Sequence, residues 1–179
     1  MTSERIVDIP EGTHVSFEKG FIVVRGSKGE LTREFNHPFI RVEVKDNKVI
    51  MKTDHERRRT LSILGTWRAL IKNMIEGTNH GYEAKLKIVY SHFPVKFSIQ
   101  DSSVLIQNFL GEKQPRKAYI IPGTEVKIDK DDVIVTGVDK EIVGQTAANI
   151  ETTCKVVGLD RRVFQDGCFI TSKPKIIGS

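Results

Sequence analysis

Apolar and polar residues alternate along the first third of the chain, a pattern that predicts short β-strands separated by turns. Strands are expected at residues 6–9, 15–17, 21–24, 31–35, 40–44 and 49–51. Apolar side chains then recur at helical spacing and predict one face of a helix, formed by Leu64, Trp67, Ile71, Met74 and Ile75. Thr53 or Asp54 is the expected cap of this helix, and Gly77 is its expected end.

The second half of the chain repeats this order of strands followed by a helix. Strands are expected at residues 82–90, 95–97, 104–109 and 133–135, and a helix capped by Asp139 follows. The buried face of that helix is expected to consist of Val143, Ala147, Ile150, Cys154 and Val157. Corresponding motifs keep a nearly constant offset: Val15 aligns with Val95, Gly29 with Gly111 and Gly65 with Gly144.

A rival alignment pairs residues 9–13 (IPEGT) with residues 121–124 (IPGT), but it leaves the first helix without a counterpart. The sequence therefore predicts an α+β protein made by tandem duplication. Each repeat is expected to pack an antiparallel β-sheet against one α-helix, because both elements must bury an apolar face. The expected domains are residues 1–80 and 81–179, with the boundary near residues 79–81.

A basic loop follows the strand at residues 104–109. Lys113, Arg116 and Lys117 lie within five residues, after Gly111, which permits a sharp turn, and on a loop stiffened by Pro115. A rigid basic loop suits phosphate groups, for which lysine supplies charge and arginine a planar fork. An ordinary solvated turn is the alternative interpretation.

Composition favours a folded protein with an anionic partner. The 179 residues are 39% hydrophobic and 28% charged, with a net charge of +5 and a pI of about 9.2. The cysteines, Cys154 and Cys168, are too few for a disulfide framework, and Cys154 lies on the apolar helix face, which predicts a buried, inert thiol. No apolar stretch has the length of a membrane span or a signal-peptide core, so a cytosolic protein is expected.

No arrangement of residues in the sequence predicts catalysis. Ser91 and His92 could supply a nucleophile and a base, but neighbours in an extended segment point to opposite sides. The sequence lacks metal-binding spacings of cysteine and histidine, and its Gly-Lys stretches at 26–29 and 111–113 lack the phosphate-loop pattern. We therefore expect no enzyme activity, no metal or other cofactor, and no small-molecule substrate.

Two further basic regions are candidates for RNA contact. The first helix carries a basic face that is typical of a solvated surface, with RNA contact the less favoured interpretation: Arg57, Arg58, Arg59, Arg68 and Lys72. Near the other end of the chain, Pro174 between Lys173 and Lys175 predicts an extended, charged arm that becomes ordered on binding.

Four motifs, in this order, resemble the family of large ribosomal subunit protein six, and most closely its archaeal branch. They are residues 90–94 (YSHFP), 108–113 (NFLGEK), 137–151, which open the second helix, and 163–167 (VFQDG). The resemblance runs nearly end to end and is stronger in the second half. It implies a duplicated α+β fold, in agreement with the repeat.

The resemblance also implies a non-catalytic component of the large ribosomal subunit in the cytoplasm. Such a protein binds large-subunit rRNA chiefly through its second domain, near the sarcin–ricin loop and the region where translation factors bind, beside neighbouring ribosomal proteins. The start of the second helix is expected to offer N–H groups to phosphate. Carried over by position, the expected RNA-binding residues are Ser91, His92, Asn108, Lys113, Arg116, Lys117, Lys140, Gln145, Arg161, Arg162, Lys173 and Lys175.

Three alternatives remain open at this point. The same duplicated fold could serve as an RNA-binding or regulatory module outside the ribosome. It could be a protein–protein adaptor whose sheet edges accept further strands. An enzyme using Ser91 or His92 is the least favoured.

Overall fold

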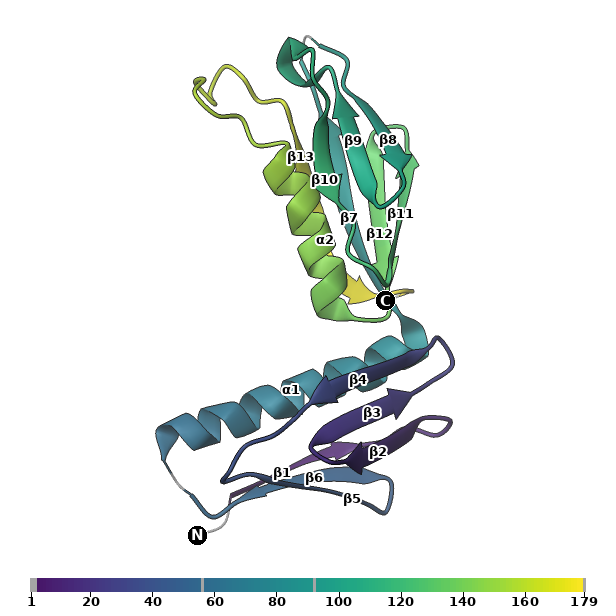
Figure 1. Ribbon diagram of the computed structural model, residues 1–179, viewed down its shortest axis with the longest axis vertical. Coiled ribbons are helices and arrows are strands. Elements are labelled where there is room, and N and C mark those ends of the chain that lie inside the picture. The colour runs from purple at the N-terminus through teal and green to yellow at the C-terminus, as the bar shows by residue number, and fades with distance from the viewer. Residues whose placement is uncertain (1–2, 56, 92, 179) are drawn as a thin grey trace. The chain divides into compact units, whose positions relative to one another are not determined.

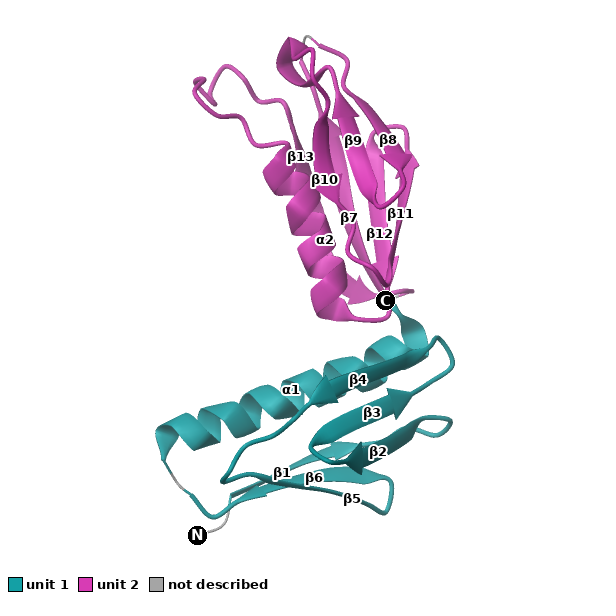
Figure 2. Cartoon of the chain, viewed as in Figure 1, with its two compact units in different colours: residues 1–81 teal, residues 82–179 magenta. Residues whose placement is uncertain are grey.

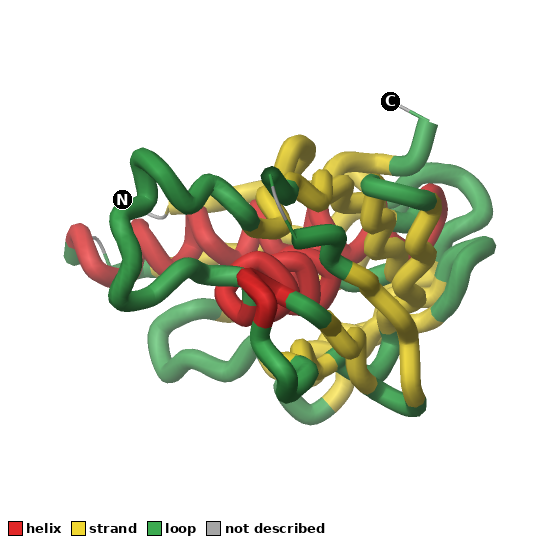
Figure 3. The backbone as a smooth tube through the Cα atoms, turned by 90° about the horizontal axis from the view of Figure 1, so that it is seen from above, coloured by secondary structure: helices red, strands yellow, loops and turns green. Residues whose placement is uncertain are grey.

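The computed structural model describes residues 3–55, 57–91 and 93–178, and it divides the chain into two compact units, Met1–Gly81 and Tyr82–Ser179 (Figure 2). This division lies one residue from the predicted boundary. Each unit combines one long helix with antiparallel strands, so the prediction of an α+β fold is confirmed. Figure 3 shows the helices in red and the strands in yellow. Neither helix is apolar enough over the length required to cross a membrane.

The described residues of unit 1 form six strands in two sheets (Figure 1). One sheet has the order β1-β6-β5 and the other β2-β3-β4. Helix α1 packs on both sheets and closes a core that includes Val24, Met51, Leu64 and Ile71. The elements are β1 (Ser3–Asp8), β2 (His14–Glu18), β3 (Phe21–Arg25), β4 (Glu30–Glu34), β5 (Arg41–Lys45), β6 (Lys48–Thr53) and α1 (Arg58–His80).

Both predicted ends of α1 are wrong. Thr53 is the last residue of β6, where its hydroxyl donates to the Phe39 carbonyl at 2.6 Å, so neither it nor Asp54 caps the helix. The helix also continues past Gly77, because Gly77 and Thr78 are buried against the rest of the unit. It ends where Gly81 adopts φ of +77°, a conformation that glycine tolerates and other residues rarely adopt.

Unit 2 repeats this architecture and adds a strand. Its sheets have the orders β11-β12-β7-β13 and β10-β9-β8, in which β7, β12 and β11 correspond to β1, β6 and β5. The rival alignment is excluded, since residues 121–124 lead into β11 and residues 9–13 into β2, which belong to different sheets of the repeat. The elements are β7 (Tyr82–Val89), β8 (Lys96–Gln100), β9 (Ser103–Gln107), the 3-10 turn η1 (Phe109–Gly111), β10 (Arg116–Tyr119), β11 (Thr124–Asp129), β12 (Asp132–Gly137), α2 (Lys140–Thr153) and β13 (Gly167–Ile176).

The predicted C-terminal arm is instead strand β13. It pairs antiparallel with β7, with Cys168 opposite Ile88 and Lys175 opposite Glu83. The backbone N–H and C=O groups on the edge of β7 that faces away from β12 need hydrogen-bond partners, and β13 provides them. Pro174 faces α2, where a methyl group at Gly144 would lie 3.4 Å from its Cγ. Proline is tolerated here because β13 is an edge strand.

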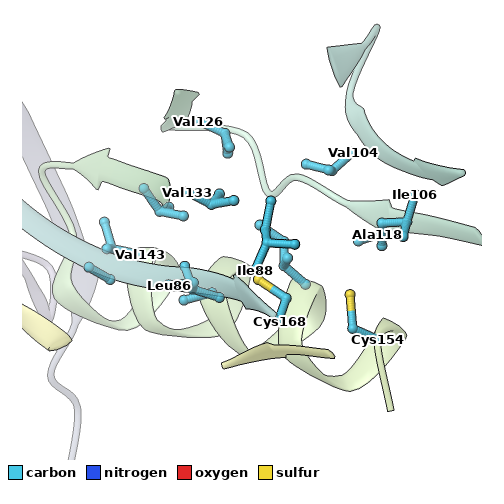
Figure 4. Close-up of a cluster of buried hydrophobic side chains, with 14 of the residues drawn as sticks. Leu86, Ile88, Val104, Ile106, Ala118, Val126, Val133, Val143, Cys154 and Cys168 are labelled. Carbon is cyan, nitrogen blue, oxygen red and sulfur yellow. The ribbon is translucent and has the colours of Figure 1, made fainter. Parts of the chain in front are cut away.

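The core of unit 2 lies between the two sheets and α2 (Figure 4). Cys154 and Cys168 are buried and not disulfide-bonded, as Figure 4 shows, and a hydrogen bond with the Cys154 side chain, together with burial, raises the pKa of the Cys168 thiol. Val157 was expected in this core but is 77% exposed, because α2 ends at Thr153. Val156 is buried in its place.

Candidate nucleic-acid interface

The basic loop after β9 is held by backbone geometry that the sequence pattern does not reveal. Asn108 adopts left-handed φ of 59°, and its side-chain amide donates to the Pro94 carbonyl at 3.1 Å. The reversal at Asn108 buries Phe109 beside Ile106, although strand alternation placed them on opposite faces. Asn108 therefore acts first as a turn residue, and Lys113 projects from the exposed segment after η1.

Arg116 is a structural residue of this loop. Its guanidinium makes two hydrogen bonds to the Glu112 carboxylate, through Nε at 2.8 Å and Nη2 at 2.5 Å. Nη1 donates to the carbonyls of Thr153 and Lys155 at 2.9 and 3.0 Å, at the C-terminus of α2. The carbon of the guanidinium lies 4.3 Å from the centroid of the buried Phe109 ring.

These contacts use four of the five N–H groups of the arginine. Glu112 raises the pKa of Arg116, and Arg116 lowers that of the Glu112 carboxyl, chiefly through the hydrogen bonds that join them. The guanidinium thus packs α2 against η1, and a contact between Arg116 and phosphate stays a prediction.

The start of α2, where a phosphate was predicted to bind, carries two carboxylates of its own. The Asp139 carboxylate accepts the Glu141 backbone N–H at 2.8 Å, so a negative side chain already caps the helix. A second carboxylate, that of Glu141, lies in the first turn. Lys140 is half-buried, with Nζ 5.4 Å from the centroid of the Tyr82 ring. These two carboxylates disfavour a phosphate at this helix N-terminus, and the expected anion site there stays a prediction.

Lys117 and Gln145 are exposed on the neighbouring elements β10 and α2. The Gln145 amide donates to Asn149 at 3.0 Å, and Asn149 donates to the Tyr119 carbonyl of β10 at 3.2 Å. This chain of hydrogen bonds fixes the β10 edge against α2. Lys117 projects from that edge into solvent.

The loop at residues 155–166 carries two more of the predicted cations, Arg161 and Arg162, and packs beside the end of β7. The Ser91 backbone N–H donates to the buried Asp166 carboxylate at 3.0 Å, which fastens the loop to the chain after β7. Arg162 makes two hydrogen bonds to Asp160 at 2.9 and 3.1 Å but remains almost fully exposed. Arg161 lies beside it.

Seven of the twelve predicted residues lie at two opposite ends of unit 2. One end holds Ser91, Lys113, Arg161 and Arg162. It also holds the exposed Lys155, which the sequence prediction missed, and we call these five residues the basic end. In Figure 1 this end holds η1 and the loop that follows α2. Within the described residues, neither Lys113 nor Arg161 forms an ion pair, so both cations are available to a ligand.

Lys140, Lys173 and Lys175 lie at the opposite end, near the start of β7. Val89 lies six positions after Glu83 along β7, which is roughly 20 Å at 3.3 Å per residue. The expected residues therefore form no single compact patch. His92, also predicted, lies outside the described residues.

Two exposed lysines of β7, Lys85 and Lys87, were also missed as candidates. Their alternation with the buried Ala84, Leu86 and Ile88 was a sufficient signal, because it directs them to the solvent face. Lys85 is paired with Glu83 at 3.0 Å, which leaves Lys87 as the freer of the two.

Comparison with known proteins agrees with the duplicated architecture. A sequence model of the family described as Ribosomal protein L6 matches the chain twice, at residues 9–81 and 93–167, once in each unit. The large ribosomal subunit protein uL6 of Methanothrix thermoacetophila is 43% identical over 169 residues, covering 94% of this chain and 96% of the relative. That of Methanospirillum hungatei is 43% identical over 173 residues (97% and 98%), and that of Methanosarcina mazei 41% over 169 residues (94% and 96%).

These matches place the two-repeat α+β fold among the ribosomal proteins, and the relatives are named as ribosomal components rather than enzymes. The prediction of a non-enzymatic protein is thereby confirmed. The chain belongs to the ribosomal protein L6 family, and its archaeal relatives confirm the resemblance found in the sequence.

Proposed function

We propose that this protein is a structural component of the large ribosomal subunit in the cytoplasm and that it binds large-subunit rRNA through the basic end of unit 2. The names of its relatives support the ribosomal assignment. The contact is proposed to lie near the sarcin–ricin loop and the region of translation-factor binding, beside neighbouring ribosomal proteins.

The observation that carries the proposal is the convergence of three separate segments at the basic end. The chain after β7, the turn η1 and the loop after α2 meet there, and each is anchored to its neighbour by hydrogen bonds. Lys113 and Arg161 are therefore presented from a rigid frame. Folded RNA is recognised largely through its shape and phosphates, for which fixed cations are suited.

The test is a titration of the full chain with an rRNA fragment that contains the sarcin–ricin region, at several salt concentrations. A structured RNA of equal length and unrelated sequence is the control. We expect tighter binding to the rRNA fragment, and the double variant Lys113→Ala/Arg161→Ala should reduce the salt slope by about 0.7–0.9 for each phosphate that the protein no longer neutralises.

Lys127→Ala is the matched control, because Lys127 is exposed on β11 in the same unit but away from the basic end. It should leave the salt slope unchanged. Equal affinity for the two RNAs, or equal slopes for the double variant and the wild type, would contradict the proposed contact. If the double variant binds RNA as the wild type does and loses binding only to a ribosomal protein, the adaptor hypothesis is favoured.

A further inference from the structure

A cavity of about 650 Å³ lies at the basic end, between the loop after α2 and the ends of β7 and β13. This volume falls within the range of roughly 300–1,000 Å³ found for pockets that bind small organic groups. Nothing in the rRNA contact proposed above uses the interior of the cavity. Its lining combines apolar and charged side chains, chiefly Phe164, Phe169, Glu151, Lys155, Arg161 and Asp166.

The apolar lining includes two exposed aromatic rings. Phe164 is 39% and Phe169 41% exposed, and Val89 beside them is also exposed. The Phe169 ring folds back over Gly167, so that a methyl group at Gly167 would lie 2.7 Å from the ring. Glycine at this position leaves room for the ring, whose exposed part is available as a stacking surface.

The polar lining is balanced in charge. Lys155 and Arg161 contribute two positive groups, and Glu151 and Asp166 contribute two negative groups. Both carboxylates are held by backbone donors, Glu151 by the Ile170 N–H at 2.9 Å and Asp166 by the Ser91 N–H at 3.0 Å. A bare phosphate would meet these carboxylates and be repelled. A flat, uncharged group with N–H donors would not.

We propose that the cavity receives one unpaired nucleobase of the bound RNA. The base would stack on Phe164 or Phe169 and donate hydrogen bonds to a fixed carboxylate, while Arg161 and Lys155 at the rim meet the adjoining phosphates. Guanine fits best, because its N1–H and N2–H lie side by side and match the two oxygens of a carboxylate. This inference rests on the proposed binding of rRNA.

Base stacking and edge recognition of this kind are how proteins usually read single-stranded RNA. The exposed aromatic rings could instead accept an apolar side chain of a neighbouring protein. The charged lining favours the base, since an apolar side chain would take water from these charged groups and return no hydrogen bond to them. Docking of a protein partner is therefore an opposing outcome of the experiment.

The first variant is Phe164→Ala, which removes one ring from a half-exposed position while the backbone turn from Phe164 N–H to the Asp160 carbonyl is kept. Phe169→Ala is the second variant, should the first disturb folding. Phe21→Ala, at an aromatic residue of similar exposure in unit 1, is the matched control. Removal of one stacking surface should weaken binding to the rRNA fragment by about 5- to 150-fold, without change in the salt slope.

Abasic substitutions at each unpaired position of the fragment then identify the base. At one position, the abasic substitution is expected to weaken binding of the wild type about as much as Phe164→Ala does. The same substitution should have little further effect on the Phe164→Ala protein, because the effects of removing two groups that contact each other are not additive. Fragments that carry each of the four bases in turn at that position are then compared, and the fragment with guanine should bind most tightly.

The inference is overturned if the wild type binds the rRNA fragment specifically and both phenylalanine variants bind equally well. In that case the phosphate contacts stand and the nucleobase site does not. A selective loss of binding to a ribosomal protein by the variants would overturn it in favour of protein docking. Absence of specific binding by the wild type would refute the proposed function and this inference with it.

Discussion

Replacement of Arg116 by alanine separates a structural role of the guanidinium from a role in RNA binding. The side chain is 24% exposed and connects Glu112, the end of α2 and the Phe109 ring. The substitution removes all of these contacts at once. It also leaves the half-buried Thr153 carbonyl without its donor.

The expected destabilisation follows from these contacts. A cation at a helix C-terminus contributes about 0.3–1 kcal/mol, and a partly exposed cation–π contact contributes about 0.5–1 kcal/mol. A charged hydrogen bond to a half-buried carbonyl contributes about 1.5 kcal/mol. The contributions overlap because one group makes them all, so we expect a decrease of about 2 kcal/mol in the free energy of unfolding of unit 2.

The two units can be followed separately in the full chain. The only tryptophan, Trp67, lies in α1 and reports on unit 1, and hydrogen exchange of the backbone amides of α2 and β10 reports on unit 2. Arg116→Ala should weaken protection in unit 2 and leave the Trp67 transition unchanged. Lys117→Ala, at the exposed next residue, should change neither by more than about 0.5 kcal/mol.

Salt-dependent binding to the rRNA fragment completes the test. While unit 2 remains folded, Arg116→Ala should keep the wild-type salt slope, whereas Lys113→Ala should lower it by about 0.7–0.9. An unchanged stability together with a lower slope for Arg116→Ala would refute the structural assignment. It would restore Arg116 as a phosphate contact.

Three further predictions concern stability. Arg116 lowers the pKa of Glu112, so the stability of the wild type relative to Glu112→Gln should be fully present above the ordinary glutamate pKa of about 4.3. This extra stability should be lost as the pH falls through the lowered pKa of the folded protein. Acid unfolding curves that coincide for the two proteins would contradict this. Asp139→Ala removes the cap of α2 and should cost about 1 kcal/mol in urea unfolding, with Asp139→Ser as the capped control. Gly26→Ala places a methyl group 2.6 Å from the Thr78 carbonyl oxygen, so its unit 1 transition, read by tryptophan fluorescence, should shift to lower denaturant concentration.

The repeat, the fold class and most of the core could be predicted from the sequence, because each depends on local periodicity. In α2, Val143, Ala147 and Ile150 are buried as their spacing predicts, and so is Cys154 just after the last helical residue. The Asp139 cap was predicted for the same reason, since its hydrogen bond joins residues two apart. Periodicity failed at Val157, where the helix ends earlier than the apolar pattern does.

The site residues depended on contacts between distant segments, which periodicity does not encode. Lys113 and Arg116 look alike in sequence as cations of one loop, yet only Arg116 meets carbonyls at and just after the end of α2, 37 and 39 residues away. Lys173 and Lys175 resemble a mobile tail until β13 pairs with β7. The sequence by itself thus determined where cations are abundant, and the tertiary structure decided which of them are used by the fold and which are exposed to a ligand, because backbone carbonyls and sheet edges become partners only after the chain has folded.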